Sequence, residues 1–266
     1  MIGWRQWQAL RANPVYLREK GHWGTPNPFY ANLTRYSPFM VIGAVLFGVC
    51  AGSANPSLFS GNDDLVVAAC FLCLPGFLLT AVAVYGQFMA LALTAPSISL
   101  ERAAGTWDIL RMTPVSMQTI LLGKLFGALS RLRIWPLLLA LSLLQGGILA
   151  ASVTIFGGDG AFWGWLLGLA AMLRPWTEVI FAAFVGLYVS TVVESAMMAL
   201  VGAYTAVVLL KLFNSSGFWL AAVLLANGGG ATSLVLPTVG PVLVYGLAIT
   251  AVLLGLMQQA KKLSYG

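Results

Sequence analysis

Long apolar runs, separated by short polar stretches, dominate the chain. Six of these runs are close to or above the ~20 residues that an α-helix needs to cross the hydrocarbon core of a bilayer. They occupy residues 36–54, 65–95, 134–156, 175–192, 195–212 and 238–257. The pattern predicts an all-α integral membrane protein with six transmembrane helices, in a domain that spans residues 36–257.

The second run is longer than a bilayer requires, so we expect it to be tilted or to project from the membrane, with a kink at Pro75-Gly76. The stretch 118–133 is interpreted as the cytoplasmic end of a long helix that continues into the third run. It carries Lys124, Arg131 and Arg133. These long side chains are expected to snorkel to the lipid headgroups, because charges are costly at the bilayer centre.

Residues 161–193 are too long for one simple span, and Arg174-Pro175 and Glu178 divide them. We expect a short outer segment at 161–173, followed by the fourth span. Glu194 then marks a tight cytoplasmic turn before the fifth span.

Residues 218–236 are apolar, but Asn227-Gly228-Gly229-Gly230 interrupts them. Consecutive glycines are poor helix formers. Non-helical backbone at membrane depth is tolerated only where protein or water satisfies its polar groups. This segment is therefore predicted to be a re-entrant hairpin before the last span rather than a span itself.

The first 35 residues mix polar and aromatic side chains. Trp4, Trp7 and Leu10 alternate with arginines in a way that is typical of an amphipathic helix on a membrane surface. Asn13-Pro14 ends or interrupts this helix, since the residue before a proline avoids the α conformation. Residues 1–35 are predicted to form a cytoplasmic amphipathic segment.

The composition agrees with membrane insertion. The 266 residues are 59% hydrophobic and only 8% charged, whereas soluble domains carry roughly a quarter charged residues. The net charge of +6 does not indicate nucleic-acid binding, because the basic residues cluster in the N-terminal segment, the central polar loop and the C-terminal tail at 258–266. The positive-inside rule places these three regions, and both termini, on the cytoplasmic side of the cell (cytoplasmic or inner) membrane.

Enzyme chemistry is not expected. Gly123-Lys124 lacks the upstream glycine and the following Ser or Thr of a nucleotide-binding P-loop, so the chain is not expected to hydrolyse ATP itself. No catalytic residues, metal ligands or cofactor-binding residues are predicted. Two small-residue pairs, Gly123-x-x-x-Gly127 and Gly164-x-x-x-Gly168, have the spacing that allows close helix contact, but in a chain with 29 glycines chance is the favoured explanation of each.

The polar interruption at 96–117 is the most informative segment. Gly105-Thr106 is expected to form a turn in which Thr106 caps a short helix. Thr113-Pro114 ends that helix, and Ser116 caps the next one. Charged and apolar side chains on this helix suit docking to a soluble partner, and the alternative is an ordinary interfacial loop.

This segment resembles the signature of ABC-2-type transporter permeases. The matching elements are Glu101-Arg102, Gly105-Thr106, Thr113-Pro114-Val115-Ser116 and Gly123-Lys124. Weaker matches are Asn13-Pro14-Val15 with Arg18-Glu19, and the run from Gly186 to Ser190. Ala103-Ala104 departs from the family, in which a more charged run often stands here.

The resemblance implies a half-transporter that pairs as a homodimer or heterodimer and works with a separate ABC ATPase subunit. It also implies that the 101–114 segment is the coupling helix that docks in this ATPase. The docking residues would be Glu101, Arg102, Gly105, Thr106, Trp107, Asp108, Arg111, Thr113 and Pro114.

Two functions remain open. The first is a permease for an unidentified substrate, hydrophobic if the scarcity of polar residues in the spans reflects the cargo. The second is a non-transporting scaffold or accessory subunit of a larger membrane complex. Arg174, Glu178 and Glu194 are candidates for a transport pathway or for structural charges. For Arg174 and Glu178 the favoured interpretation is mutual pairing, since residues at i and i+4 share a helix face.

Overall fold

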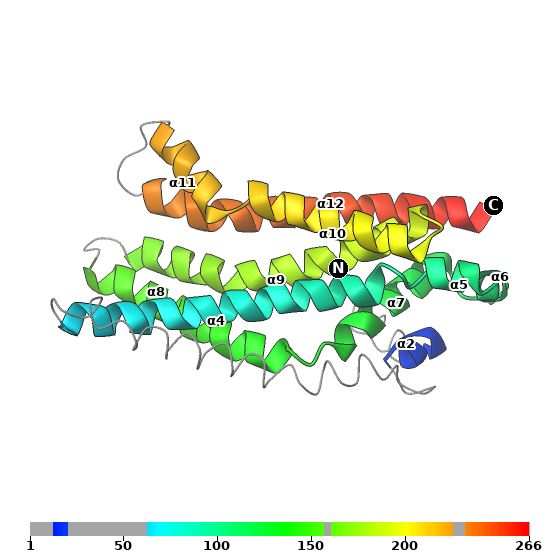
Figure 1. Ribbon diagram of the computed structural model, residues 1–266, viewed down its shortest axis with the longest axis horizontal. Helices are drawn as coiled ribbons and strands as arrows, with labels where there is room; N and C mark the ends of the chain where they lie inside the picture. The colour runs from blue at the N-terminus through cyan, green and yellow to red at the C-terminus, as the bar shows by residue number, and fades with distance from the viewer. Residues whose placement is uncertain (1–12, 21–62, 157–160, 226–231, 266) are drawn as a thin grey trace. The chain divides into compact units, whose positions relative to one another are not determined.

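The computed structural model describes residues 13–20, 63–156, 161–225 and 232–265, and every regular element in them is an α-helix (Figure 1). The chain divides into two compact units. Unit 1 draws its described residues from Met1–Thr25, Tyr85–Leu132 and Thr177–Gly266, and unit 2 draws its own from Pro26–Val84 and Arg133–Trp176. Each unit is described by itself below.

Four stretches of the described residues are long and apolar enough to cross a membrane. They are Pro75–Ala103, Phe162–Val192, Ala196–Trp219 and Leu236–Leu263. A fifth is reached if two consecutive helices, α7 (Met117–Arg131) and α8 (Trp135–Phe156), are counted as one broken span. The prediction of an all-α membrane protein is thereby confirmed, while the first expected span, 36–54, and most of the N-terminal segment lie outside the described residues.

Two helices have 32 residues each and contain an internal proline: α4 (Asp63–Thr94) contains Pro75, and α9 (Ala161–Val192) contains Pro175. The predicted division of 161–192 into an outer segment and a separate span is therefore wrong. A proline removes one backbone hydrogen bond, but every other backbone group in a bilayer still needs a partner. Continuing the helix through the proline satisfies those groups.

The predicted long helix across residues 118–156 is also wrong, because α7 and α8 are separate helices. Leu132 has extended backbone angles (φ −70°, ψ 100°) at the end of α7. Pro136 explains the interruption: its ring would collide with the carbonyl of Leu132, four residues earlier, and it has no N–H to donate to that carbonyl.

The C-terminal part of unit 1 contains α10 (Ala196–Phe213), α11 (Ser216–Leu225) and α12 (Thr232–Tyr265). Helix α11 packs against the first part of α12, so the chain folds back on itself across residues 226–231, which are not among the described residues (Figure 1). The last helix begins at Thr232 instead of residue 238. It also continues to Tyr265, so residues 258–265 are a helical extension of α12.

Asn214 joins α11 to α12. Its side-chain amide donates to the carbonyl of Pro241 (2.9 Å), and its side-chain oxygen accepts from the indole N–H of Trp219 (2.8 Å). The Trp219 ring lies over Gly240, where a Cβ atom would come within 3.2 Å of the ring. Specific contacts of the Asn214 and Trp219 side chains therefore hold α11 against α12.

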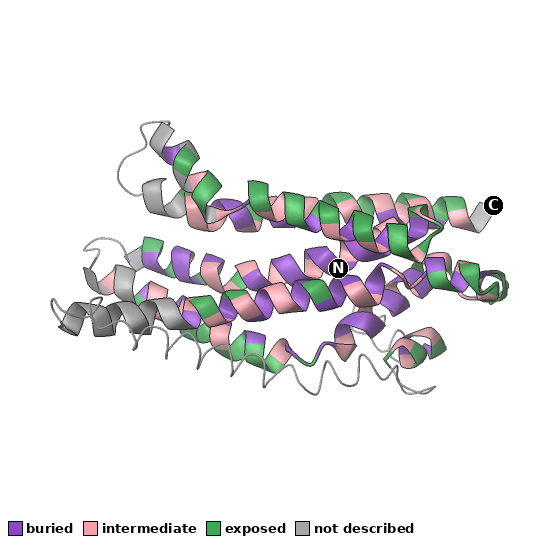
Figure 2. Cartoon of the chain, viewed as in Figure 1, coloured by how far each residue is buried: buried purple, intermediate pink, exposed green. Residues whose placement is uncertain are grey.

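Much of the apolar surface of the described helices is exposed (Figure 2). On α10 only a narrow row at i, i+4 and i+8 is fully buried: Ala199, Ala203 and Val207. Large apolar side chains cover the rest of that helix. This distribution is what a membrane helix requires, because lipid covers the outer face.

Unit 2 is held together by close contact between α8 and the first part of α9. A Cβ atom on Gly168 would lie 2.6 Å from the carbonyl oxygen of Gly146, and one on Gly164 would lie 3.0 Å from that of Ala150. Absent side chains thus let the two backbones approach, as the Gly164-x-x-x-Gly168 spacing allows.

Candidate functional site

The central segment folds as two short helices, α5 (Ser99–Ala103) and α6 (Thr106–Arg111). Gly105 forms the turn between them with a left-handed backbone (φ +68°), a conformation that favours glycine. The expected turn is present, but Thr106 is not the cap. Gly105 occupies that position, and the Thr106 hydroxyl instead donates to the carbonyl of Glu101 (3.3 Å).

Helix α6 presents most of its surface to the outside (Figure 2). Asp108 and Arg111 are exposed, and so are the apolar side chains of Ile109 and Met112, at 68% and 85%. The following Thr113 and Pro114 are exposed too, and α6 ends before them as predicted. This helix and its C-cap residue Met112 thus expose two large apolar side chains beside two charges, a combination that suits contact with another protein.

Three other members of the predicted docking set serve a different purpose. Trp107 is buried, and the guanidinium of Arg102 lies 5.7 Å from the centre of its ring. Arg102 also donates to the carbonyl of Thr191 at the end of α9 (3.0 Å). Glu101 is buried as well. These residues hold the segment in place, so only part of the predicted set is available to a partner.

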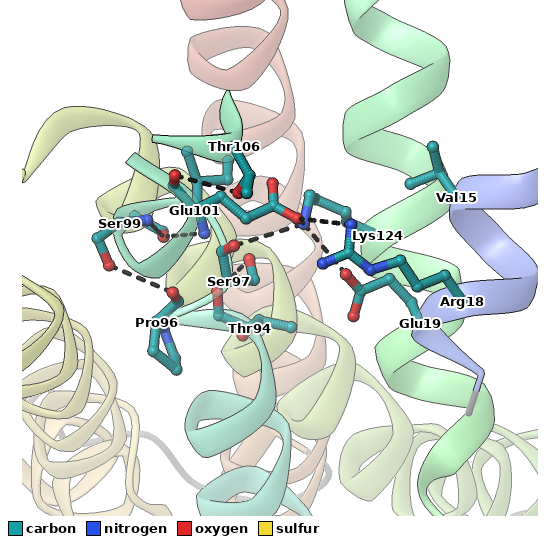
Figure 3. A network of polar contacts seen from close by, with 12 residues as sticks. Val15, Arg18, Glu19, Thr94, Pro96, Ser97, Ser99, Glu101, Thr106 and Lys124 are labelled. Atoms are coloured by element: carbon teal, nitrogen blue, oxygen red, sulfur yellow. Dashed lines mark hydrogen bonds and ion pairs between the residues drawn. The ribbon is translucent and has the colours of Figure 1, made fainter. Parts of the chain in front are cut away.

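Glu101 belongs to an ionic cluster around Lys124, which we call the Lys124 cluster (Figure 3). The Lys124 ammonium lies 2.9 Å from Oε1 of Glu101 and 3.1 Å from Oε1 of Glu19. It donates further to the carbonyl of Ser97 (3.4 Å). Arg18 approaches Glu101 at 3.7 Å. All three N–H groups of the lysine thus have an acceptor.

The prediction that Lys124 snorkels to the headgroups is wrong, since its side chain is only 1% exposed. Two carboxylates and a carbonyl satisfy the ammonium inside the protein, which removes the reason to reach for water. The pairing of Lys124 with Glu19 could not be predicted from local sequence, because the two residues are 105 positions apart along the chain.

Glu19 is delivered by α2 (Pro14–Glu19), a helix that packs on α7. Asn13 has an extended backbone and its side chain accepts from the N–H of Val15 (2.9 Å), so Asn13-Pro14 starts α2; the helix expected before Asn13 lies outside the described residues. A Cβ on Gly127 would collide with Glu19, whereas one on Gly123 would make ordinary contact with Val15 and Tyr16 at 3.7 Å. Gly127 alone therefore permits the close approach of α2 to α7.

Ser190 links α5 to α9. Its hydroxyl accepts from the backbone N–H groups of Ile98 (2.9 Å) and Ser99 (3.2 Å). On the other side of the segment, Ser116 caps α7 as predicted and accepts from the N–H of Thr119 (3.3 Å). The elements on which the family resemblance depends are scattered along the sequence. Three of them contact α5, through Arg18, Lys124 and Ser190.

A second polar cluster lies among α4, α9 and α10, and we call it the Lys211 cluster. The Lys211 ammonium contacts Oε2 of Glu178 (2.8 Å) and Oε1 of Gln87 (3.2 Å), and the Gln87 amide donates to the same Glu178 oxygen. Glu178 therefore has partners on two other helices, which the sequence did not indicate. Its pairing with Arg174 stays a prediction. Glu194 lies exposed in the connection between α9 and α10.

Comparison with protein-family models, with curated proteins and with solved structures finds no match to this chain. Within the described residues, no group of three or more His, Cys, Asp or Glu side chains is arranged to hold a metal ion. The features on which a function can be argued are the exposed helix α6 and the contacts that anchor the segment behind it.

Proposed function

We propose that this chain is the membrane-spanning subunit of an ATP-driven ABC-2-type transporter, and that α6 docks into a separate ABC ATPase subunit. The observation that carries the proposal is the combination of an exposed α6 with a buried anchor. Ile109, Met112, Asp108 and Arg111 are offered to a partner, while Glu101 behind them is fixed by Lys124.

This arrangement gives a physical route from a partner to the membrane helices. A displacement of α6 reaches α5 across the Gly105 turn, because the Thr106 hydroxyl is bonded to the Glu101 carbonyl. From α5 it reaches α7 through the ion pair of Glu101 with Lys124, and α9 through Ser190. Packed elements joined by buried polar contacts move together, because breaking such contacts leaves unsatisfied charges.

The remaining features of the proposal concern topology and assembly. If α7 and α8 are counted as one broken span, the described residues supply five spans and the apolar run at 36–54 supplies a sixth. Six spans place both termini in the cytoplasm, with the protein in the cytoplasmic (inner) membrane. Two such subunits, identical or different, form the transport unit, and membrane lipids surround it. The apolar character of the spans favours a hydrophobic substrate.

The experiment is a gentle purification of the full chain from its native membrane, with the associated proteins identified and counted. The proposal expects a stoichiometric subunit that binds ATP. Asp108→Lys and Ile109→Asp are expected to reduce its recovery about tenfold or more, because a reversed or buried unpaired charge opposes docking. Glu194→Lys is the matched control. Glu194, like Asp108, is an exposed acidic residue, but it lies outside α6, in the connection between α9 and α10.

Membrane insertion and thermal stability should be unchanged in all three variants, because the replaced side chains are exposed. Docking through α6 would be contradicted if both the Asp108→Lys variant and the Ile109→Asp variant recovered as much of the ATP-binding subunit as the wild type does. Co-purification with a different assembly that lacks any ATP-binding subunit would instead support the accessory-subunit function.

A further inference from the structure

A groove runs along unit 2 between α8 and the first part of α9. Its volume is about 460 Å³, within the range of roughly 300–1,000 Å³ that small-molecule sites occupy. Gly146, Gly168 and Ala150 line its floor, and Phe162, Trp165 and Leu169 form much of its walls. Every lining side chain is uncharged.

The groove owes its depth to missing side chains. Gly146 and Gly168 are used up by the contact between the helices, because a Cβ on either would lie within 2.7 Å of the opposite carbonyl. Gly147 differs from both, since a Cβ built there meets nothing within 4 Å. Gly147 therefore opens directly into the groove and can be enlarged without a clash.

We infer that this groove binds one acyl chain of a membrane phospholipid. Both helices belong to the membrane part of the protein, so lipid is the surrounding medium. Water is disfavoured, because the lining offers too few polar groups to bind it. Lipid tails gain little from leaving other tails, so binding must come from close packing in a preformed shape.

The walls of the groove favour a single chain over a second protein helix. Phe162 and Trp165 are 70% and 71% exposed and stand above buried glycines. Such bulky side chains hold a neighbouring helix backbone away from the floor, whereas a chain one methylene wide can reach it. Close helix pairs in membranes instead need small residues along the whole contact.

The same walls give the bound lipid a direction. Phe162 and Trp165 lie in the first turns of α9. Tryptophan side chains near the ends of membrane helices are enriched at the level of the lipid headgroups, so Trp165 marks that level and Phe162 lies one turn nearer the helix end. The polar end of the lipid therefore lies near Phe162 and Trp165, and its acyl chain runs past Gly147 towards Leu143 and Met172. This inference needs only membrane embedding and does not rest on the proposed transporter function.

The test is photo-crosslinking in lipid nanodiscs that contain the full chain. The probe is a phosphatidylcholine with a diazirine near the end of one acyl chain, and the adducts are located by mass spectrometry of the digest. Adducts are expected to concentrate on α8 and α9 around Leu143 and Met172. Gly147→Leu, which fills the groove, is expected to reduce them about tenfold.

Gly246→Leu in α12 is the matched control. Gly246 is also exposed, and a Cβ there also meets nothing within 4 Å, but it does not line the groove. Labelling of the groove should be unchanged in this variant. Both replacements put leucine in place of glycine in a helix, which favours helix formation, and thermal unfolding checks that each variant is folded.

Three results would overturn the inference. The first is labelling of the groove no stronger than that of the exposed apolar face of α12. The second is labelling that Gly147→Leu leaves unchanged, with Gly147→Ala as a smaller replacement in case the leucine variant is unstable. The third is efficient disulfide cross-linking of two Gly147→Cys chains, which would assign the groove to a second copy of the protein.

Discussion

Lys124 and Lys211 are both lysines of largely apolar helices in unit 1, yet their surroundings differ. The side chain of Lys124 is 1% exposed, and two carboxylates and a backbone carbonyl surround its ammonium. The side chain of Lys211 is 32% exposed, and its described partners are one carboxylate and one amide oxygen. The Lys124 ammonium is thus enclosed by protein acceptors, with Oε2 of Glu101 buried beside it without a hydrogen-bond partner, while the Lys211 cluster is partly exposed.

The difference in exposure between the two lysines indicates which of the two charges holds helices together. A lysine without access to water or headgroups needs every N–H satisfied, and the Lys124 cluster achieves this with segments from α2, α5 and α7. Lys211 can direct part of its side chain outward, so fewer protein partners suffice. We therefore expect the fold to depend on Lys124 more than on Lys211.

Lys124→Met is expected to have the largest effect. It removes the cation that the buried Glu101 shares with Glu19 and leaves Glu101 only the exposed Arg18 at 3.7 Å, and breaking a buried pair in this way costs about 3–5 kcal/mol. The melting temperature in a mild detergent measures the loss. The double variant Lys124→Met with Glu101→Gln should recover part of it, and a single variant as stable as wild type would contradict the anchoring role.

Lys211→Leu should cost less, about 1–3 kcal/mol. Glu178 keeps the hydrogen bond from Gln87, and the replaced side chain is partly exposed. The same melting measurement, run beside Lys124→Met, tests the comparison directly. Adding Glu178→Gln should restore stability, and an effect larger than that of Lys124→Met would reverse the ranking of the two clusters.

Ser190→Ala separates neutral hydrogen bonding from charge. It removes the acceptor for the N–H groups of Ile98 and Ser99, both of which are buried, and should cost about 1–2 kcal/mol. Ser190→Thr keeps the hydroxyl and serves as the control. If Ser190→Ala destabilised the protein as much as Lys124→Met, the ionic cluster would not be the principal anchor of α5.

Arg18→Ala should have the smallest effect of the four, about 0.5 kcal/mol or less. Arg18 belongs to the Lys124 cluster, but its side chain is 54% exposed and lies 3.7 Å from Glu101. Comparison of its melting temperature with that of wild type is sufficient. A loss of several kcal/mol would mean that the network depends on its exposed arginine and not on its buried lysine.

Local features of the central segment were predictable because their causes are local. The turn at Gly105, the end of α6 before Thr113-Pro114 and the cap at Ser116 follow from backbone preferences and from side chains three residues away. The cap expected at Thr106 failed for an equally local reason, since the left-handed glycine before it already starts the helix.

Helix boundaries around prolines were less predictable. Pro175 and Pro136 both lie in largely apolar stretches, yet α9 continues through the first and the helix is interrupted just before the second. A proline always removes a backbone hydrogen bond, and the packing around it decides whether the helix continues with a kink or ends there. Sequence periodicity carries no information about that packing.

The sequence by itself determined that the protein is a helical membrane protein, because a run of apolar residues long enough to cross a bilayer can satisfy its backbone only as a helix. It also determined which segment stands out from the apolar background. Only the tertiary structure decided that Glu101 is buried while Ile109 and Met112 are exposed, and that Lys124 is paired and does not snorkel. The pairing of Lys124 depends in part on Glu19 of α2, 105 positions away, and no local pattern encodes that contact.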